Sequence, residues 1–304
     1  MRVALCLYGL TGAVDFGYGL GKSIDPRIGH HHHLKHIIEP NNADVFIHSW
    51  NTEFEDLLVK LYEPKKHIIE PQIMFNPNSA AENSIISRWW SNSVVMDLKH
   101  QYEKENNFEY DWVILYRFDH VFLVDLKFEK FNNENIYFRH SNGLRAPEQY
   151  SHGYPGREKC LCYNKKGKYG TRLMDVFIFS NSKNMDKFAS VYEWHQENSK
   201  DFNMSPHDEC YAQLERENMQ NKLDFAFHGY DPHAFKKGYN IMQCELIRAL
   251  YETPEYVEGN FNIKDFKIIK EDLTNNPIVK SRFPGWGVPQ QIKSKANQAG
   301  FKNI

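Results

Sequence analysis

Short apolar runs alternate with amphipathic segments along most of the chain. The apolar runs predict strands at 3–8, 44–50, 66–69, 110–116, 136–139, 173–179 and 223–227. Apolar positions at helical spacing and helix-boundary residues predict helices at 30–39, 79–105, 184–197 and 206–218. Ser79, with Glu82 three residues later, forms a capping box that opens the longest of these helices. Strands and helices in this order predict an α/β fold with a mixed, mainly parallel sheet flanked by helices.

The composition fits one globular domain. Hydrophobic residues make up 41% and charged residues 25% of the 304 residues, so a packed core is expected. We expect a single domain at 1–283, in which the aperiodic segment 143–170, rich in Gly, Lys and Tyr, forms a loop or lid. Residues 284–304 are polar and predict a peripheral tail. The net charge of −2 provides no basic field for nucleic acid, so that class of partner is not expected.

Cysteine spacing and hydropathy indicate the cellular compartment in which the protein is expected. The five cysteines are irregularly spaced, which predicts free thiols in a reducing compartment rather than a structural zinc site. The apolar stretch at the N-terminus is too short for a signal peptide, and no segment is long enough for a transmembrane helix. A cytoplasmic protein is therefore expected, and the sequence does not indicate its oligomeric state.

The strand at 110–116 carries the strongest functional signal, because it ends in two opposite charges, Arg117 and Asp119. The carboxyl ends of strands in an open α/β sheet face the ligand crevice. A carboxylate there suits a divalent cation or a sugar hydroxyl, and a guanidinium suits phosphate. The alternative is a structural ion pair, because side chains two residues apart on a strand share a face.

Several motifs, taken in order, resemble a known family. A glycine-containing loop follows the first strand, and the second strand lies in residues 41–50 (NNADVFIHSW). The long helix ends in residues 102–111 (YEKENNFEYD), ahead of Arg117-Phe118-Asp119. Across residues 1–235 this order resembles glycosyltransferases of the GT-A type, which are encoded in polysaccharide gene clusters and in genomes of phages and large viruses.

The resemblance implies a GT-A-like (Rossmann-like) fold. It also implies an enzyme that moves a monosaccharide from a UDP- or GDP-linked donor to a glycan or glycoconjugate acceptor. It also commonly implies a Mn²⁺ or Mg²⁺ ion held by an Asp-x-Asp motif. Asp119 is then the expected metal ligand, and the resemblance makes a late histidine, His228, a candidate for a further one. Arg117 stands where the motif has its first acid, which leaves metal dependence open.

The donor side is expected around the first two strands. In a GT-A-like fold the loop after the first strand contacts the nucleotide, which selects Tyr8, Gly9 and Thr11, although a plain flexible turn is the alternative. Trp50 follows the second strand at the same sheet edge and is a candidate stacking surface for the donor. Together with Arg117 and Asp119, these residues form the predicted donor site.

The acceptor side needs a general base if the reaction inverts the sugar. Asp175 is the first candidate, because a lone acid entering an apolar strand is unusual and burial would raise its pKa. A buried ion pair with Arg172 is its alternative. Asp208 and Glu209 rank lower, because acids at the start of a helix are expected to stabilise that end of the helix.

The run His30-His31-His32-His33, with His36, suggests a metal site at first sight. Consecutive helical residues point in different directions, so we expect a solvated, partly charged helix instead. Two other function classes remain open. One is a non-catalytic module that binds glycan or nucleotide-sugar on the same fold, and the other is a metal-dependent hydrolase built on the histidines.

Overall fold

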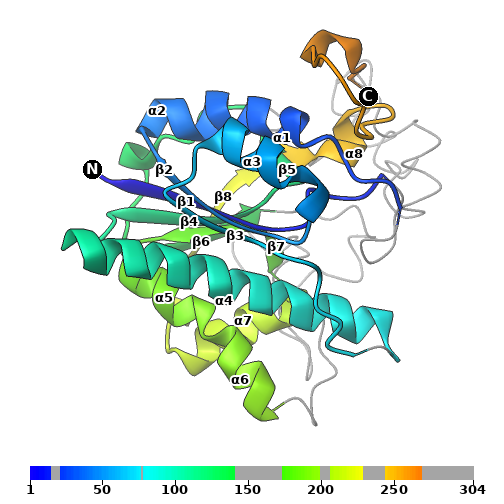
Figure 1. The fold of residues 1–304 in the computed structure, drawn as a ribbon. Helices are drawn as coiled ribbons and strands as arrows, with labels where there is room; N and C mark the ends of the chain where they lie inside the picture. Colours follow the sequence, from blue (N-terminus) through cyan, green and yellow to red (C-terminus); the bar gives the residue numbers. More distant parts are fainter. Residues whose placement is uncertain (15–20, 77, 141–172, 199–205, 229–243, 269–304) are drawn as a thin grey trace, which may run out of the picture.

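The computed structural model describes residues 1–14, 21–76, 78–140, 173–198, 206–228 and 244–268. Within these residues the chain forms an α/β fold with a mixed, mostly parallel sheet between two layers of helices (Figure 1). This confirms the predicted α/β class with a mixed, mainly parallel sheet flanked by helices. The segments predicted as a loop at 143–170 and a tail at 284–304 lie outside the described residues.

The main sheet has seven strands in the order β3-β2-β1-β4-β7-β6-β8. Strands β3, β2, β1 and β4 are parallel, β7 runs antiparallel to both of its neighbours, and β6 is parallel to β8. Their bounds are β1 Val3–Gly9, β2 Asp44–Ser49, β3 Lys66–Ile69, β4 Trp112–Arg117, β6 Ile136–His140, β7 Met174–Ser180 and β8 Leu223–His228.

The order of the strands reverses between β1 and β4. After β1 the chain moves outward to β2 and β3, and it then returns through a long helix to place β4 on the other side of β1. Ligands in open α/β sheets bind beside the carboxyl ends of the strands at such a switch point. Tyr8 and Arg117 are paired neighbours at this position.

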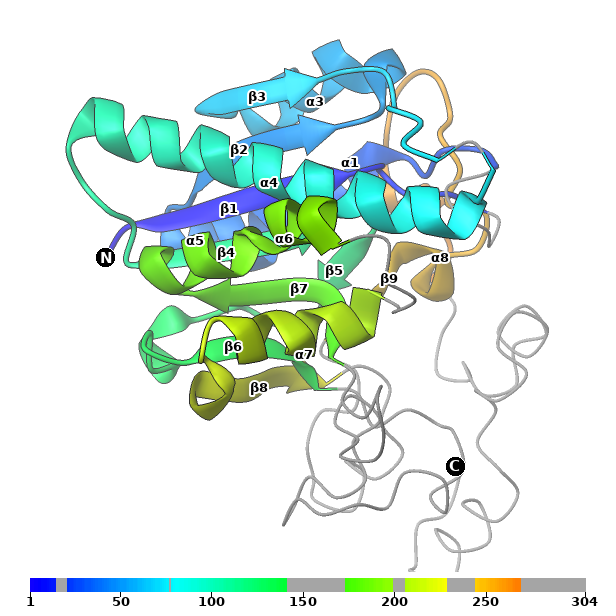
Figure 2. The ribbon, with the colours of Figure 1, turned by 90° about the horizontal axis from the view of Figure 1, so that it is seen from below.

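Helices cover both faces of the sheet. Figure 1 shows one layer above the sheet, made of α1 Pro26–His33, a π-helical turn at Leu34–Ile38, α2 Glu39–Asn41 and α3 Glu55–Tyr62. The opposite layer, seen face-on in Figure 2, consists of α4 Ala80–Asn106, α5 Ser182–Ala189, α6 Val191–Asn198 and α7 Pro206–Arg216.

Local chemistry explains the ends of the longest helix. The Ser79 hydroxyl accepts a hydrogen bond from the Glu82 backbone N–H at 3.2 Å, so the serine half of the predicted capping box is confirmed. The other half is not formed, because the Ser79 backbone N–H donates to the Asn76 carbonyl oxygen and the Glu82 carboxylate accepts from the Asn76 side-chain amide. At the other end Asn107 adopts φ 53°, a left-handed conformation that asparagine tolerates well. None of the described helices is both long and apolar enough to cross a membrane.

Some elements differ from the predictions. The helix predicted at 184–197 is two helices, α5 and α6, separated at Ser190. Helix α3 was not predicted, and neither was a small two-stranded sheet of β5 His120–Phe122 and β9 Cys244–Leu246, which leads into α8 Ile247–Leu250. Strands β5 and β9 are only three residues long, too short for a hydrophobic period to mark them.

Three histidines of the run, His32, His33 and His36, are buried, so the predicted solvated helix is wrong for these three, whereas His31 is exposed. The His33 ring nitrogens lie 2.9 Å from the Tyr62 hydroxyl and from the His120 carbonyl oxygen. His32 Nε2 lies 2.6 Å from the Tyr251 hydroxyl. His36 Nδ1 lies 2.9 Å from a carboxylate oxygen of Asp125. These different partners show why the side chains do not converge on one ion.

Candidate functional site

The carboxyl edge of the sheet brings together predicted residues from three strands. Tyr8, one residue before the end of β1, pairs with Arg117, the last residue of β4. Because β7 runs antiparallel to β4, its first residues, including Asp175, lie at this same edge. Asp119 follows two residues after Arg117. The structure therefore brings together four predicted residues, Tyr8, Arg117, Asp119 and Asp175. Arg88, His207 and Arg248 lie beside them, and we call these seven residues the edge cluster.

Asp175 is held by an arginine that the sequence did not single out. One of its carboxylate oxygens accepts a hydrogen bond from Arg88 of α4, and the same guanidinium also bonds to the Asp175 carbonyl oxygen. Arg88 Nη2 donates to the Tyr8 hydroxyl at 2.6 Å, and that hydroxyl donates to the Asp175 carbonyl oxygen at 3.0 Å. The side chains of Arg88 and Asp175 are 13% and 4% exposed, so this ion pair is largely buried.

His207 of α7 completes this side of the edge cluster. Its Nδ1 lies 3.3 Å from the second carboxylate oxygen of Asp175 and 3.1 Å from the Leu173 carbonyl oxygen. The His207 side chain is 36% exposed, far more than that of Asp175. A buried carboxylate beside a more accessible imidazole is an arrangement that can orient a histidine for proton transfer.

The charges decide the protonation state of this group. Burial would raise the pKa of the Asp175 carboxyl, but Arg88, His207 and Arg117 outweigh burial and hold that pKa below its usual value. The expected upward shift of the Asp175 pKa is therefore corrected, because its neighbours are cations. Burial raises the pKa of Tyr8 to about 12, so the Tyr8 hydroxyl remains protonated at neutral pH.

Arg117 and Asp119 form a two-pronged ion pair. Arg117 Nε donates to one carboxylate oxygen of Asp119 at 2.8 Å, and Nη2 donates to the other at 2.6 Å. The Asp119 side chain is 2% exposed, whereas that of Arg117 is 26% exposed. Arg248 Nη1 lies 3.9 Å from the same carboxylate. The structural ion pair considered from the sequence is thus present, and it leaves the guanidinium as the more accessible partner.

The glycine loop after β1 packs directly onto Asp119. A Cβ on Gly12 would lie 2.6 Å from the Asp119 Cβ, and Gly12 adopts φ 106°, which side-chain-bearing residues rarely adopt. The Thr11 backbone N–H donates to the Asn51 side-chain carbonyl at 2.7 Å. The predicted donor loop therefore contacts the predicted acid, although residues 15–20 lie outside the described part of the chain.

Trp50 and Gly9 lie beside this loop. The Trp50 backbone N–H donates to the Gly9 carbonyl at 3.3 Å, and the Trp50 ring meets His48 edge-on at 4.6 Å between ring centroids. Trp50 is 6% exposed, so its ring is packed in the protein and the expectation of an open stacking surface is corrected. Gly9, by contrast, has no described atom within 4 Å of where a Cβ would stand.

Of the remaining candidates, Glu209 is described and lies outside the edge cluster. Glu209 is fully buried, where it accepts a hydrogen bond from Trp89 Nε1 and lies 3.4 Å from His195 Nδ1. Burial raises the Glu209 pKa, and its contacts hold α7 against α4 and α6. Asp208 is in the first turn of α7 and His228 is the last residue of β8, but both side chains lie outside the described part.

The geometry around Asp119 does not fit the divalent cation that the resemblance implies. Both Asp119 oxygens already accept bonds from Arg117, and the charged described groups in contact with it are the cations Arg117 and Arg248. A cation needs several oxygen ligands at about 2.1 Å if it is Mg²⁺. The second acid of the edge cluster, Asp175, is bound by Arg88 and does not supply them.

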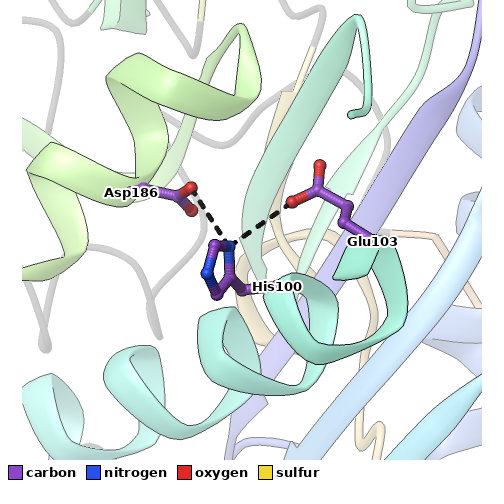
Figure 3. Close-up of side chains that lie close together, drawn as sticks. All are labelled: His100, Glu103 and Asp186. Atoms are coloured by element: carbon purple, nitrogen blue, oxygen red, sulfur yellow. Dashed lines mark ion pairs between the residues drawn. The ribbon is translucent and has the colours of Figure 1, made fainter. Parts of the chain in front are cut away.

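A different group of ligand-type side chains lies at the other end of α4. Figure 3 shows His100 and Glu103 of α4 and Asp186 of α5 pointing toward one another, with His100 Nδ1 3.7 Å from an oxygen of each acid. The buried Lys99 ammonium lies 3.0 Å from Glu103 and 2.6 Å from Asp186, so both acids already have a cationic partner. This group fastens α4 to α5 near the start of β4, far along the strand from the edge cluster.

Arg88, His207 and Arg248 were missed by sequence reasoning. Arg88 carried a usable signal, because it stands three residues after Ile85, next to Trp89, on the helix face that packs on the sheet. A lone cation on such a face requires a buried anion. His207 carried no such signal, because its partner Asp175 lies 32 residues earlier, across a segment outside the described part.

No protein-family model matches the chain, and no curated protein is significantly similar to it. The function is therefore argued from the edge cluster and from the position of that cluster in the sheet.

Proposed function

We propose that this chain is a GT-A-like glycosyltransferase that moves a monosaccharide from a UDP- or GDP-linked donor to a carbohydrate acceptor. The observation that carries the proposal is the edge cluster at the switch point between β1 and β4. Three arginines there face two aspartates, so the cluster carries a net positive charge that suits a diphosphate.

The two halves of the edge cluster suit the two substrates. The Gly9–Gly12 loop and Arg117 face the donor, because backbone N–H groups and a guanidinium both bind phosphate oxygens. Asp175 and His207 serve the acceptor, because Asp175 is ionised and lies 3.3 Å from the more exposed imidazole. Asp175 thus positions His207, which takes the proton of the attacking hydroxyl.

The proposed reaction forms one bond, breaks one bond and transfers one proton. The acceptor oxygen forms a bond to the sugar C1, and the bond between C1 and the donor phosphate oxygen breaks. The electron pair of the broken bond leaves with the nucleoside diphosphate, and the acceptor proton passes to His207. Positive charge near the leaving diphosphate stabilises it as the bond breaks.

A donor screen scored by released nucleotide tests this proposal. The full chain should release UDP or GDP from at least one nucleotide-sugar, faster with glycan acceptors than without them. His207→Gln should lower kcat by roughly 10²-fold or more, as loss of a general base does, with a smaller change in KM. The matched control is His67→Gln, since His67 is exposed on β3.

Two outcomes would count against the proposal. Binding of UDP or GDP without release in any donor and acceptor combination would favour the non-catalytic module. No release and no rise in melting temperature with any nucleotide would reject nucleotide-sugar chemistry altogether, because a ligand of the folded state raises that temperature.

A further inference from the structure

The Arg117–Asp119 pair presents a guanidinium, and not a carboxylate, to the switch point. Asp119 uses both oxygens on Arg117, and its side chain is 2% exposed. An arginine side chain carries five N–H donors, of which Asp119 engages one on Nε and one on Nη2. The donors of Nη1 and the second donor of Nη2 have no partner among the described residues, and the Arg117 side chain is 26% exposed.

The surroundings keep this guanidinium charged and in place. Burial would lower the pKa of Arg117, but Asp119 and Asp175 raise it above its usual value, so Arg117 stays cationic. Gly12 packs closely against Asp119, because a Cβ on Gly12 would lie 2.6 Å from the Asp119 Cβ. Arg248, 3.9 Å from Asp119, adds a second cation on the same carboxylate.

A leaving diphosphate needs positive charge, which either a metal ion or fixed guanidinium donors can supply. The ligands around Asp119 do not fit a cation, as described above, whereas the remaining donors of Arg117 fit phosphate oxygens as a rigid fork. A guanidinium already held by a carboxylate loses little further freedom when it binds phosphate.

We propose that transfer by this chain needs no divalent cation and that the Arg117 guanidinium, positioned by Asp119, takes the place of the metal against the donor diphosphate. This rests on the proposed glycosyltransferase function. As the bond between C1 and the phosphate oxygen breaks, Arg117 neutralises the electron pair left on the phosphate, while C1 bonds to the acceptor oxygen and His207 takes the proton. Asp119 is a positioning residue and does not touch the donor.

The direct test measures released nucleotide from the full chain, with the best UDP- or GDP-sugar of the donor screen, after exhaustive treatment with EDTA. The rate in EDTA should equal the rate in added Mn²⁺ or Mg²⁺. UDP or GDP, used alone as a probe, should also raise the melting temperature equally in EDTA and in Mn²⁺. Loss of turnover in EDTA with recovery in Mn²⁺ would overturn the inference and leave the proposed function standing.

Variants of Arg117 test the role of the guanidinium. Arg117→Gln should lower kcat by roughly 10²–10³-fold, the usual cost of removing one stabilising donor group, with a smaller effect on KM. Arg117→Lys keeps the positive charge but loses the planar pair of donors, so its kcat should lie between that of the wild type and that of Arg117→Gln. The matched control is Arg2→Gln, because the exposed Arg2 precedes the amino end of β1, at the opposite end of the strand from Tyr8.

The outcomes separate this inference from the function on which it rests. Wild-type turnover by Arg117→Gln would overturn the inference but not the function. No turnover by the wild type with any donor, in EDTA or in metal, would reject the function, and the inference with it. If Arg117→Gln does not fold, the turnover of the wild type in EDTA and in Mn²⁺ still decides whether transfer needs a divalent cation.

Discussion

Arg88→Met is expected to lower the free energy of unfolding by about 3–5 kcal/mol, the usual cost of removing one partner of a buried ion pair. The Asp175 carboxylate is 4% exposed, and Arg88 is the cation that binds both that carboxylate and the Asp175 carbonyl oxygen. Without Arg88, Asp175 keeps His207 but loses its strongest counter-charge. Urea denaturation followed by circular dichroism at neutral pH measures the change.

Two further variants define the cause. Lys22→Met removes a cation from an exposed pair with Glu255, in which the side chains are 76% and 36% exposed, and should cost at most about 1 kcal/mol. Adding Asp175→Val to Arg88→Met should recover part of the loss, because the uncompensated charge is then gone. A loss from Arg88→Met as small as that from Lys22→Met would contradict the ion pair described here.

Acid should destabilise the protein between pH 6.5 and 5, well above the range in which carboxylates protonate. Burial lowers the pKa of His32 and of His33 from 6.5 to about 3. The unfolded chain then binds more protons than the folded chain below pH 6.5, so stability falls as the pH falls toward 3. At pH 5 each histidine should cost roughly 2 kcal/mol relative to pH 7. Chemical denaturation at the two pH values measures the difference.

Substitution separates the histidines from other acid effects. His33→Gln cannot be protonated in this range, so the loss between pH 7 and pH 5 should shrink by roughly 2 kcal/mol. His67→Gln, at an exposed position on β3, should leave the loss unchanged. Equal stability of the wild type at pH 7 and pH 5 would show that His32 and His33 are not buried in their neutral form.

Much of the fold could be predicted because the central strands contain continuous apolar runs. Strand β4 is buried from Trp112 to Tyr116, and such runs are visible without knowledge of their neighbours. The capping box at Ser79 marked the start of α4 for a similar local reason. The reversal of β7 could not be predicted, because strand direction depends on the route of the connection and not on the strand's own residues.

The site was predictable in place but not in detail. Arg117 and Asp119 stand at the carboxyl end of a predicted strand, so their place at the ligand edge followed from the α/β pattern. Asp175 stands near the start of its strand and reaches the same edge only because β7 is antiparallel. The partners of these residues decided their chemistry, and those partners are distant in sequence. Arg88 lies 87 residues from Asp175, and its charge reverses the pKa shift expected from burial alone. The inward-facing His33 likewise depends on Tyr62 and His120, from other parts of the chain.

Hydrogen–deuterium exchange of the full chain, with and without saturating UDP or GDP in EDTA, tests most directly whether the edge cluster binds the donor diphosphate. We expect slower exchange of backbone amides at residues 8–12 and 117–119 when the nucleotide is present, and an unchanged rate around His100 and Asp186. Protection confined to the helices that carry His100 and Asp186, or no protection at the carboxyl edge of β1 and β4, would contradict it.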